Sequence, residues 1–189
     1  MSVTSPVLET ERLWLDPVVD DDAPAMLGIY ADWRVMRLFG QDPFVDLEHA
    51  RSCLDIQRDL QQSGIGLWWA LRREKGGEMI GAVNLDGINR QWHNTGISYL
   101  LAESQRGQGL MGEALAVVLA WCFAGGLGCP IRRVQALVFA ENLASRRVLE
   151  KLDFAFEGRR RDLMYWLGRY WDLDAFSLLN PLLERAADA

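Results

Sequence analysis

Cysteine and histidine, which most often bind metals or form cross-links, are scarce in this sequence. The chain has three cysteines and two histidines. Cys53, Cys122 and Cys129 lack metal-ligand spacing, and Cys122 lies in an apolar stretch that predicts a place in the core. His49 and His93 are expected at the surface. The odd cysteine count favours a reducing compartment, so we predict a cytoplasmic protein with no metal site.

Long apolar runs and a basic leader are also absent. No hydrophobic run reaches the ~18–20 residues that span a bilayer. The opening residues, Met1-Ser-Val-Thr-Ser-Pro6, contain no basic side chain. We therefore expect neither a membrane segment nor a signal peptide. Because 50% of the residues are hydrophobic, the composition is that of a folded chain, and we predict a single domain over residues 1–189.

An excess of positive charge is the third absence. The net charge of −6 argues against a nucleic-acid-binding protein. The acids are concentrated in residues 1–62, which carry twelve acidic and five basic side chains, while the remainder is nearly balanced. Such a region either attracts a cationic partner or is a solvated surface, and the sequence leaves both alternatives open.

The most informative stretch that is present runs from Ser98 to Leu115. Its apolar start predicts a strand, its polar middle predicts a loop with Gly107 and Gly109, and an apolar helix is expected to begin at Leu110. No Ser, Thr, Asp or Asn stands at the expected cap position, so the first N–H groups of this helix are free for a ligand. A glycine loop that leads into an uncapped helix is typical of a phosphate-binding site.

Two other interpretations of this loop have to be weighed. Gly107, Gly109 and Gly112 also satisfy the G-x-G-x-x-G pattern of nicotinamide-dinucleotide sites. That pattern normally follows the first strand and has an acidic residue about 20 positions later, and neither condition holds here. A Walker-type loop is excluded because no Gly-Lys-Ser/Thr follows. A glycine turn without any ligand remains an alternative.

A second motif lies downstream of the glycine loop and favours a ligand-binding interpretation of that loop. It reads Asn142-Leu-Ala-Ser-Arg-Arg-Val-Leu-Glu-Lys-Leu-Asp-Phe154 and follows an apolar strand-like segment. This motif resembles the Asn-x-x-Ser-x-x-Val-Leu-Glu-Lys-Leu-Gly-Phe segment of the GNAT N-acetyltransferases. The glycine loop resembles their Arg/Gln-x-x-Gly-x-Gly/Ala pyrophosphate loop, with Arg106, Gly109 and Met111 at its fixed positions.

The ends of the chain resemble one branch of that family. Leu8-Glu-Thr-Glu-Arg-Leu-Trp-Leu15 is similar to the first strand of the RimJ/RimL-like enzymes, which acetylate N-terminal amines of ribosomal proteins. Glu157-Gly158 and the late Gly168, Asp172 and 176–179 segment are similar to that branch as well. The resemblance covers nearly the whole chain. It implies acceptor-side helices at about 20–62 and an acetyl-CoA-binding core at about 95–154.

The fold class implied is α/β (α+β), a single GNAT domain. We expect a mixed, mostly antiparallel sheet of about seven strands with about four helices, whose central strands splay apart. The pattern of the chain agrees, with an alternating first strand, early helices and a strand pair around a Gly-Gly turn. The residue ranges expected for these elements are 11–16, 22–30, 46–62, 67–73, 79–85, 95–102, 110–123, 132–140, 142–152, 154–161 and 170–179, followed by a short tail from Leu182.

The resemblance assigns acetyl-CoA to the glycine loop and the strand before it. The backbone around the loop is expected to bind the pyrophosphate, and the strand to pair with the pantetheine arm, with an N–H near Tyr99 or Leu100 facing the acetyl carbonyl. Asn142 is expected to hydrogen-bond the pantetheine arm or simply to cap its helix, and Arg106 to reach a phosphate or remain solvated. The predicted cofactor-binding residues are Leu100, Leu101, Arg106, Gly107, Gln108, Gly109, Leu110, Met111, Gly112, Asn142 and Ser145.

The catalytic assignment departs from much of the family. Many relatives carry a tyrosine acid seven residues after the asparagine, and Leu149 stands there. The RimL-like branch uses a serine three residues after the asparagine, which predicts Ser145 as proton donor or thiolate partner; its alternative role is a helix-face hydroxyl. The position of that branch's glutamate is Met164. Asp162 and Glu103 are substitutes for this base that the sequence does not rank.

The acceptor is less defined. Trp33 and Phe44 are predicted to wall an acceptor pocket. We expect acetyl transfer to a primary amine in a ternary complex, with a protein N-terminus as first candidate and an aminoglycoside or polyamine as the next. A non-catalytic acyl-CoA sensor is the alternative of another class. No nucleic-acid or membrane partner is expected, and the protein is expected to be a monomer or homodimer.

Overall fold

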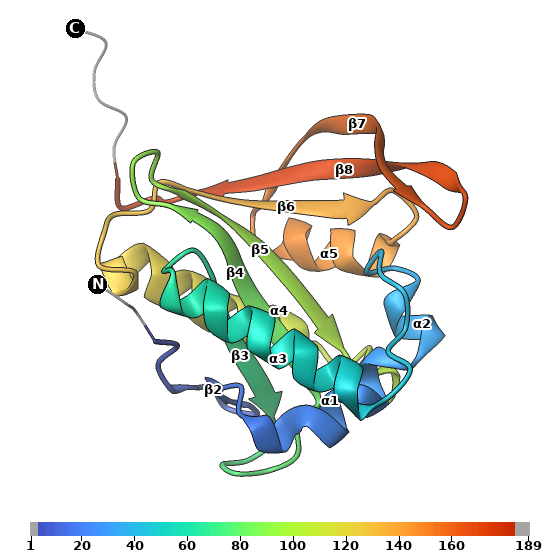
Figure 1. The fold of residues 1–189 in the computed structure, drawn as a ribbon. Coiled ribbons are helices and arrows are strands. Elements are labelled where there is room, and N and C mark those ends of the chain that lie inside the picture. Colours follow the sequence, from blue (N-terminus) through green and yellow to red (C-terminus); the bar gives the residue numbers. More distant parts are fainter. Residues whose placement is uncertain (1–3, 184–189) are drawn as a thin grey trace, which may run out of the picture.

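The computed structural model describes residues 4–183, and Figure 1 shows one open, twisted sheet with helices on both faces. The sheet has eight strands in the order β1-β2-β3-β4-β5-β6-β8-β7. The strands are β1 (Leu8–Glu9), β2 (Trp14–Pro17), β3 (Leu67–Arg72), β4 (Gly81–Asn89), β5 (Asn94–Leu101), β6 (Arg133–Phe139), β7 (Ala155–Trp166) and β8 (Arg169–Leu179). The helices are α1 (Ala23–Tyr30), α2 (Trp33–Met36), α3 (Leu47–Gln62), α4 (Leu110–Trp121) and α5 (Leu143–Lys151).

The predicted fold class is confirmed. Neighbouring strands are antiparallel except for the parallel pair β5 and β6, which the α4 crossover connects. We expected about seven strands and four helices, and the described residues form eight strands and five α-helices. The two-residue β1 and the short α2 account for the difference. The predicted tail from Leu182 extends through residues 184–189, which lie outside the described residues.

The central strands splay as expected. β5 pairs with β6 only from Asn94 to Gly96, opposite Arg133 to Gln135. Beyond Gly96 the two strands separate, while β5 remains paired with β4 up to Leu101. β6 continues along β8 over its whole length. The sheet therefore opens into a gap between β5 and β6, close to the end of β5 that leads into the glycine loop.

Two hydrophobic clusters hold the layers together. Leu67, Trp69 and Leu71 of β3 point into the cluster shared with α4, and Trp68 and Ala70 point into the cluster under α1 and α3. This alternation follows the two-residue period of a strand, and burial of all six β3 residues shows that both faces are covered. In Figure 1, α3 crosses in front of the sheet and α4 lies behind it. No helix of residues 4–183 is long and apolar enough to cross a membrane.

Helix starts follow local chemistry. Asp46 caps α3 by accepting the His49 N–H at 2.8 Å, and Asn142 caps α5. Ile56 of α3 is 58% exposed. A helix that packs on only one side leaves the remaining positions of an apolar-rich segment in water.

A buried ion pair joins the first helical turn to the sheet. Arg72 of β3 donates to Asp22 at 2.7 Å and to Asp16 at 2.8 Å, and both Arg72 and Asp22 are buried. These hydrogen bonds, led by that with Asp22, raise the pKa of the Arg72 guanidinium despite its burial. Through Asp22, the acidic run 20–22 therefore connects the start of α1 to β3.

Candidate active site

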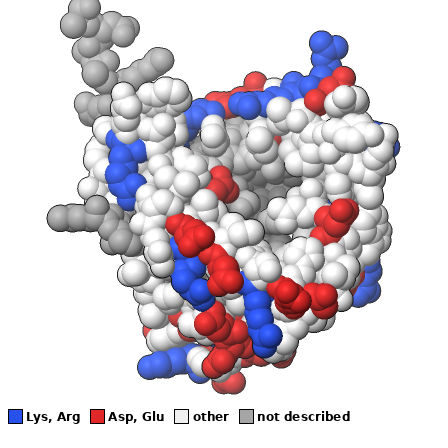
Figure 2. All heavy atoms as spheres, in the orientation of Figure 1, with Lys and Arg blue, Asp and Glu red and all other residues white. Residues whose placement is uncertain are grey.

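The gap between β5 and β6 contains a cavity of about 230 Å³. Side chains of the α2–α3 connection, of both strands and of the start of α5 form its walls. The lining includes Leu38, Phe39, Ser98, Tyr99, Asn142 and Ser145. On the face of the molecule that carries α3, Figure 2 shows a hollow between that helix and the strands above it, with acidic side chains on both sides.

The backbone of β5 faces this cavity at Tyr99. The N–H of Ala102 donates to the Ile80 carbonyl at 2.9 Å, on the β4 side of the strand. Because N–H groups alternate along a strand, the N–H of Tyr99 points to the opposite edge, toward β6. That edge has no strand partner beyond Gly96. An extended, amide-bearing ligand could therefore pair with β5 here.

Tyr99 and Ser145 meet inside the cavity. The Tyr99 hydroxyl lies 2.6 Å from the Ser145 Oγ. Burial raises the pKa of Tyr99 to about 12, and the hydrogen bond with Ser145 opposes this only in part. Tyr99 therefore keeps its proton at neutral pH. When it donates to the serine oxygen, the serine proton is available to a group in the cavity, and hydrogen bonds in series strengthen one another.

Asn142 fixes the position of this pair. Its Oδ1 accepts the Ser145 N–H at 3.1 Å, and its Nδ2 donates to the Leu38 carbonyl at 3.5 Å. The side chain thus caps α5 and also joins it to the segment after α2. Its predicted contact with a pantetheine arm remains a prediction.

The glycine loop has the backbone that a phosphate site needs. Gly107 and Gly109 have φ values of +77° and +78°, a region that disfavours other residues. Gly109 is the N-cap of α4 and makes no side-chain cap hydrogen bond. A Cβ at Gly107 or Gly112 would meet no atom within 4 Å. The loop is therefore open on the side where an anion would approach the first N–H groups of α4.

The other residues predicted to bind acetyl-CoA fall into two groups. Leu100, Leu101, Leu110 and Met111 are buried, so only their backbone can contact a ligand. Arg106 forms an ion pair with Glu103 at 2.6 Å. The arrangement holds the guanidinium beside the loop, and its contact with a phosphate remains a prediction.

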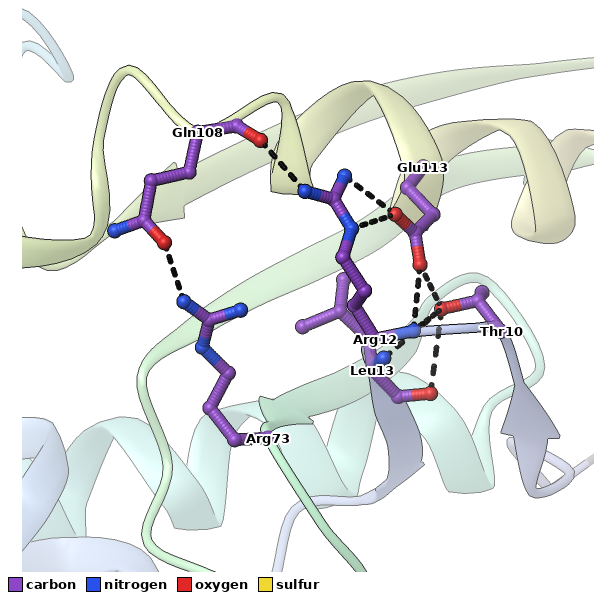
Figure 3. A network of polar contacts seen from close by, with 6 residues as sticks. All are labelled: Thr10, Arg12, Leu13, Arg73, Gln108 and Glu113. Carbon is purple, nitrogen blue, oxygen red and sulfur yellow. Dashed lines mark hydrogen bonds and ion pairs between the residues drawn. The ribbon is translucent and has the colours of Figure 1, made fainter.

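A polar network that was not predicted from the sequence holds the glycine loop against the segment between β1 and β2 (Figure 3). Arg12, between β1 and β2, donates to the Gln108 carbonyl at 2.9 Å and pairs with Glu113 of α4 at 2.6 Å. Thr10 also hydrogen-bonds Glu113, and Arg73 hydrogen-bonds the Gln108 side-chain oxygen. The Gln108 carbonyl and the Gly109 N–H belong to one planar peptide and point in opposite directions. Arg12 therefore orients the Gly109 N–H.

The predicted acceptor residues lie outside the cavity lining. Phe44 is buried and stacks between Tyr30 and His49, with ring centroids 4.8 and 4.3 Å away. Trp33 is 45% exposed and lies against Trp166. The aromatic ring that lines the cavity from this region belongs to Phe39. A role for Trp33 or Phe44 in acceptor binding remains a prediction.

The candidate bases are placed unequally. Glu103 is engaged with Arg106 beside the loop, as described above. Asp162 lies exposed on β7, where its N–H donates to Asp172. Leu149 stands where many relatives carry the catalytic tyrosine. It is fully buried in the main core, so this position contributes to packing here. Within residues 4–183, no cluster of three or more His, Cys, Asp or Glu could hold a metal ion.

Comparison with known proteins decides the family. A model of the acetyltransferase (GNAT) domain matches residues 12–155. The chain belongs to the GNAT acetyltransferase family. It is thus an acyltransferase, and acetyl-CoA is the acetyl donor that enzymes of this family use. The predicted family membership is confirmed, and the residues at the loop and at the cavity fit this donor because they supply an open anion site and a free strand edge.

Several relatives are similar over almost the whole chain. The N-acetyltransferase YoaA of Bacillus subtilis is 30% identical, with 93% of this chain and 98% of the relative covered. The ribosomal protein uS5-alanine N-acetyltransferase of Escherichia coli is 26% identical, with 92% and 91% covered. This similarity supports the predicted RimJ/RimL-like branch.

Solved structures share the fold. The ribosomal-protein-S5-alanine acetyltransferase of Vibrio fischeri has a TM-score of 0.80 at 21% identity, covering 96% of this chain and all of that chain. RimL in complex with coenzyme A has a TM-score of 0.77 at 22% identity, covering 92% and 98%. At this level of identity the likeness shows the fold alone.

Proposed function

We propose that this N-acetyltransferase transfers acetyl from acetyl-CoA to the N-terminal amine of a protein, by direct attack in a ternary complex. The observation that carries the proposal is the cavity at the gap between β5 and β6, where the Tyr99–Ser145 pair meets a free strand edge, on the strand that leads into the glycine loop. The similarity to the uS5-alanine N-acetyltransferase of Escherichia coli supports this acceptor.

The chain holds the donor through its backbone. The N–H groups from Gly107 to Gly112 bind the pyrophosphate, aided by the partial positive charge at the start of α4. The exposed edge of β5 pairs with the amide groups of the pantetheine arm, and Asn142 offers an additional polar contact. The thioester supplies an activated acetyl carbon and a thiolate leaving group.

The reaction then needs charge stabilisation and proton transfer. The Tyr99 N–H faces the gap, where it stabilises the negative charge that develops on the acetyl oxygen. The amine nitrogen forms a bond to the acetyl carbon as the carbon–sulfur bond breaks. Ser145 donates a hydrogen bond or a proton to the departing sulfur, and Tyr99 supports the serine hydroxyl. The proton lost by the amine passes to solvent or to a carboxylate.

A small cationic amine is the second candidate acceptor. The acidic character of residues 1–62 and the carboxylates around the hollow favour a positively charged molecule. Spermidine N-acetyltransferase of Vibrio cholerae has the same fold, with a TM-score of 0.78 at 17% identity. This candidate differs from the first in the acceptor alone, because the donor site and the chemistry are shared.

The decisive experiment measures free CoA release with matched acceptors. We would compare an alanine-initiated peptide, the same peptide with a blocked N-terminus, and spermidine. The proposal predicts release with the free peptide and none with the blocked one. Release with spermidine alone would move the assignment to the second candidate. Binding of acetyl-CoA without release for any amine would indicate a sensor domain in place of an enzyme.

A further inference from the structure

A row of polar side chains lies beside the cavity, on the face of the sheet that α3 covers. Asn84 and Asp86 are two residues apart on β4 and therefore point to the same face. Asn84 pairs with Ser98 of β5, and Asp86 pairs with Gly96. Cross-strand partners share a face and lie about 5 Å apart. Asn84, Asp86 and Ser98 thus form one polar row, and Ser98 also lines the cavity.

Gly96 provides the space for the carboxylate of this row. A Cβ built on Gly96 would lie 2.1 Å from the Asp86 Oδ1. The carboxylate oxygen therefore occupies the place of a side chain on β5. Gly96 is also the last β5 residue that pairs with β6. Asp86 accordingly lies over the point at which the two strands separate, at the closed end of the gap.

Asp86 supplies the charged group of this row. Among residues 4–183, no Lys, Arg or His forms an ion pair with it. The Asp86 side chain has solvent-exposed surface. The protein around it still removes part of its hydration, and this desolvation raises the pKa of the carboxyl group. The Ser98 hydroxyl partly opposes the rise in pKa. A carboxylate that is disfavoured in this way gains from an added positive charge.

Asn84 adds an unsatisfied group to the same row. Its Oδ1 is buried and has no hydrogen-bond partner within the described part of the chain. Buried polar atoms normally have partners, so this oxygen is an unsatisfied acceptor in the row. With Asp86 and Ser98 it makes a cluster of oxygen acceptors. An ammonium or guanidinium group is the ligand whose donors fit such a cluster.

The distance from the reacting centre decides what this cluster can bind. Tyr99 follows Gly96 by three positions, a span of about 10 Å along a strand. An attacking nitrogen must come within about 3–3.5 Å of the acetyl carbon. If that carbon lies beside the Tyr99 N–H, Asp86 is too far away to hold the attacking nitrogen itself. It is placed to bind a different charge on the same acceptor.

We propose that Asp86, together with Asn84 and Ser98, forms a subsite for a second cationic group of the acceptor, roughly 10 Å from the amine that is acetylated. The proposal rests on the proposed acetyltransferase function and adds a specificity to it. The second charge can be the distal ammonium of a polyamine or a Lys or Arg side chain near a protein N-terminus. Both sources present the same chemistry to the subsite.

Two variants remove the subsite by independent routes. Asp86→Asn removes the charge and keeps the shape. Gly96→Ala places a methyl group where the carboxylate oxygen lies, so it displaces Asp86 without changing the charge of the chain. Asp59→Asn is the matched control, because it removes one acid from the exposed side of α3 on the same face.

The test compares acceptors that differ only in the second charge. One arm uses a linear diamine against the monoamine of equal length, and the other uses peptides with Lys or norleucine at the third position. In the wild-type protein, kcat/KM should be about tenfold higher for the dication than for the monocation of whichever acceptor pair is a substrate. This factor corresponds to the free energy of one charged hydrogen bond. Asp86→Asn and Gly96→Ala should lose this preference but keep monocation turnover within about twofold. Asp59→Asn should behave as wild type.

Binding of the dication to the CoA complex, followed by calorimetry, gives a readout that is independent of turnover. The proposal predicts about tenfold weaker binding in both subsite variants. Equal preference in wild type and Asp86→Asn, or unchanged binding, would overturn the subsite. Absence of turnover with every amine, with binding of the dication still sensitive to Asp86, would overturn the proposed function and leave the subsite standing.

Discussion

The hydroxyl of Tyr99 and the Oγ of Ser145 lie 2.6 Å apart, although 46 positions separate them in the chain. The serine is at the start of α5, and the tyrosine is on β5, which separates from β6 at the gap but stays paired with β4. This contact joins the free edge of β5 to a proton donor. It gives Ser145 a polar partner that a solvated hydroxyl on a helix face would not need.

Ser145→Ala should lower kcat strongly and leave acetyl-CoA affinity nearly unchanged. Loss of a positioned proton donor costs about 10²-fold or more in rate. Tyr99→Phe should lower kcat less, by about tenfold, because it removes only the support of the serine. Steady-state kinetics and a separate binding titration measure the two effects. Ser52→Ala, an exposed serine on α3, is the control, and a kcat for Ser145→Ala equal to that of this control would remove the serine from the mechanism.

Arg12→Ala should weaken acetyl-CoA binding without affecting the chemistry of the bound complex. The guanidinium orients the 108–109 peptide through the Gln108 carbonyl. Loss of one charged hydrogen bond corresponds to about a tenfold higher Kd. Arg12→Lys should restore part of the affinity. A lysine ammonium can donate to the Gln108 carbonyl, but it lacks the planar guanidinium that also pairs with Glu113.

The readout for Arg12 separates positioning from folding. The rise in Kd should appear in a titration at a temperature where the variant is fully folded, while kcat at saturating acetyl-CoA stays near the wild-type value. Arg51→Ala, an exposed change on α3, should leave both the Kd for acetyl-CoA and kcat at the wild-type values. A fall in kcat with an unchanged Kd would contradict the assigned role.

The glycine loop and the start of α4 follow directly from the sequence, because φ above zero and an uncapped helix start are local properties. The contacts of Tyr99 and Arg12 do not. Arg12 and Glu113 lie 101 positions apart, and only the folded sheet brings β1 and α4 together. Pattern reasoning recognises the loop, but it does not show which distant side chain supports it.

The acceptor side was the least predictable part for a similar reason. A sequence rich in tryptophan and phenylalanine does not show which rings are buried, and Phe44 packs in the core. Asp86 was not singled out, because its position depends on the cross-strand partner Gly96. Strand register is a tertiary property, so it assigns neighbours that spacing within one segment cannot reveal.

Asp86 should make stability depend on pH with a definite sign. Its folded-state pKa is raised, so the folded protein binds this proton more tightly than the unfolded chain does. The free energy of unfolding therefore falls as pH rises from the ordinary Asp range through the folded pKa. Asp86→Asn should match wild type at low pH and be more stable than wild type above that window. Urea unfolding over a pH series tests this, and an Asn variant that is less stable at neutral pH would contradict it.

Asp22→Asn should destabilise the fold much more than loss of an exposed pair. Asp22 and Arg72 are both buried and hydrogen-bonded to each other at 2.7 and 2.8 Å. Removing one partner leaves a buried charge partly unpaired, which costs about 3 kcal/mol. Asp55→Asn, which breaks an exposed pair with Arg58, should cost less than about 1 kcal/mol. Equal losses in denaturant unfolding would show that the buried pair has no special weight.

Thermal melting with acetyl-CoA, CoA and NAD, on wild type and Gly109→Val, is the most direct test of the donor site. A valine at Gly109 cannot easily adopt φ +78°, and Gly76→Val is the control because it imposes a similar strain in the β3–β4 turn. A ligand present at about 100 times its Kd stabilises by roughly 2.7 kcal/mol. The account predicts that both CoA species, but not NAD, raise the Tm of wild type and of Gly76→Val and fail to do so for Gly109→Val. A shift with NAD alone, or the same CoA shift in Gly109→Val, would contradict it.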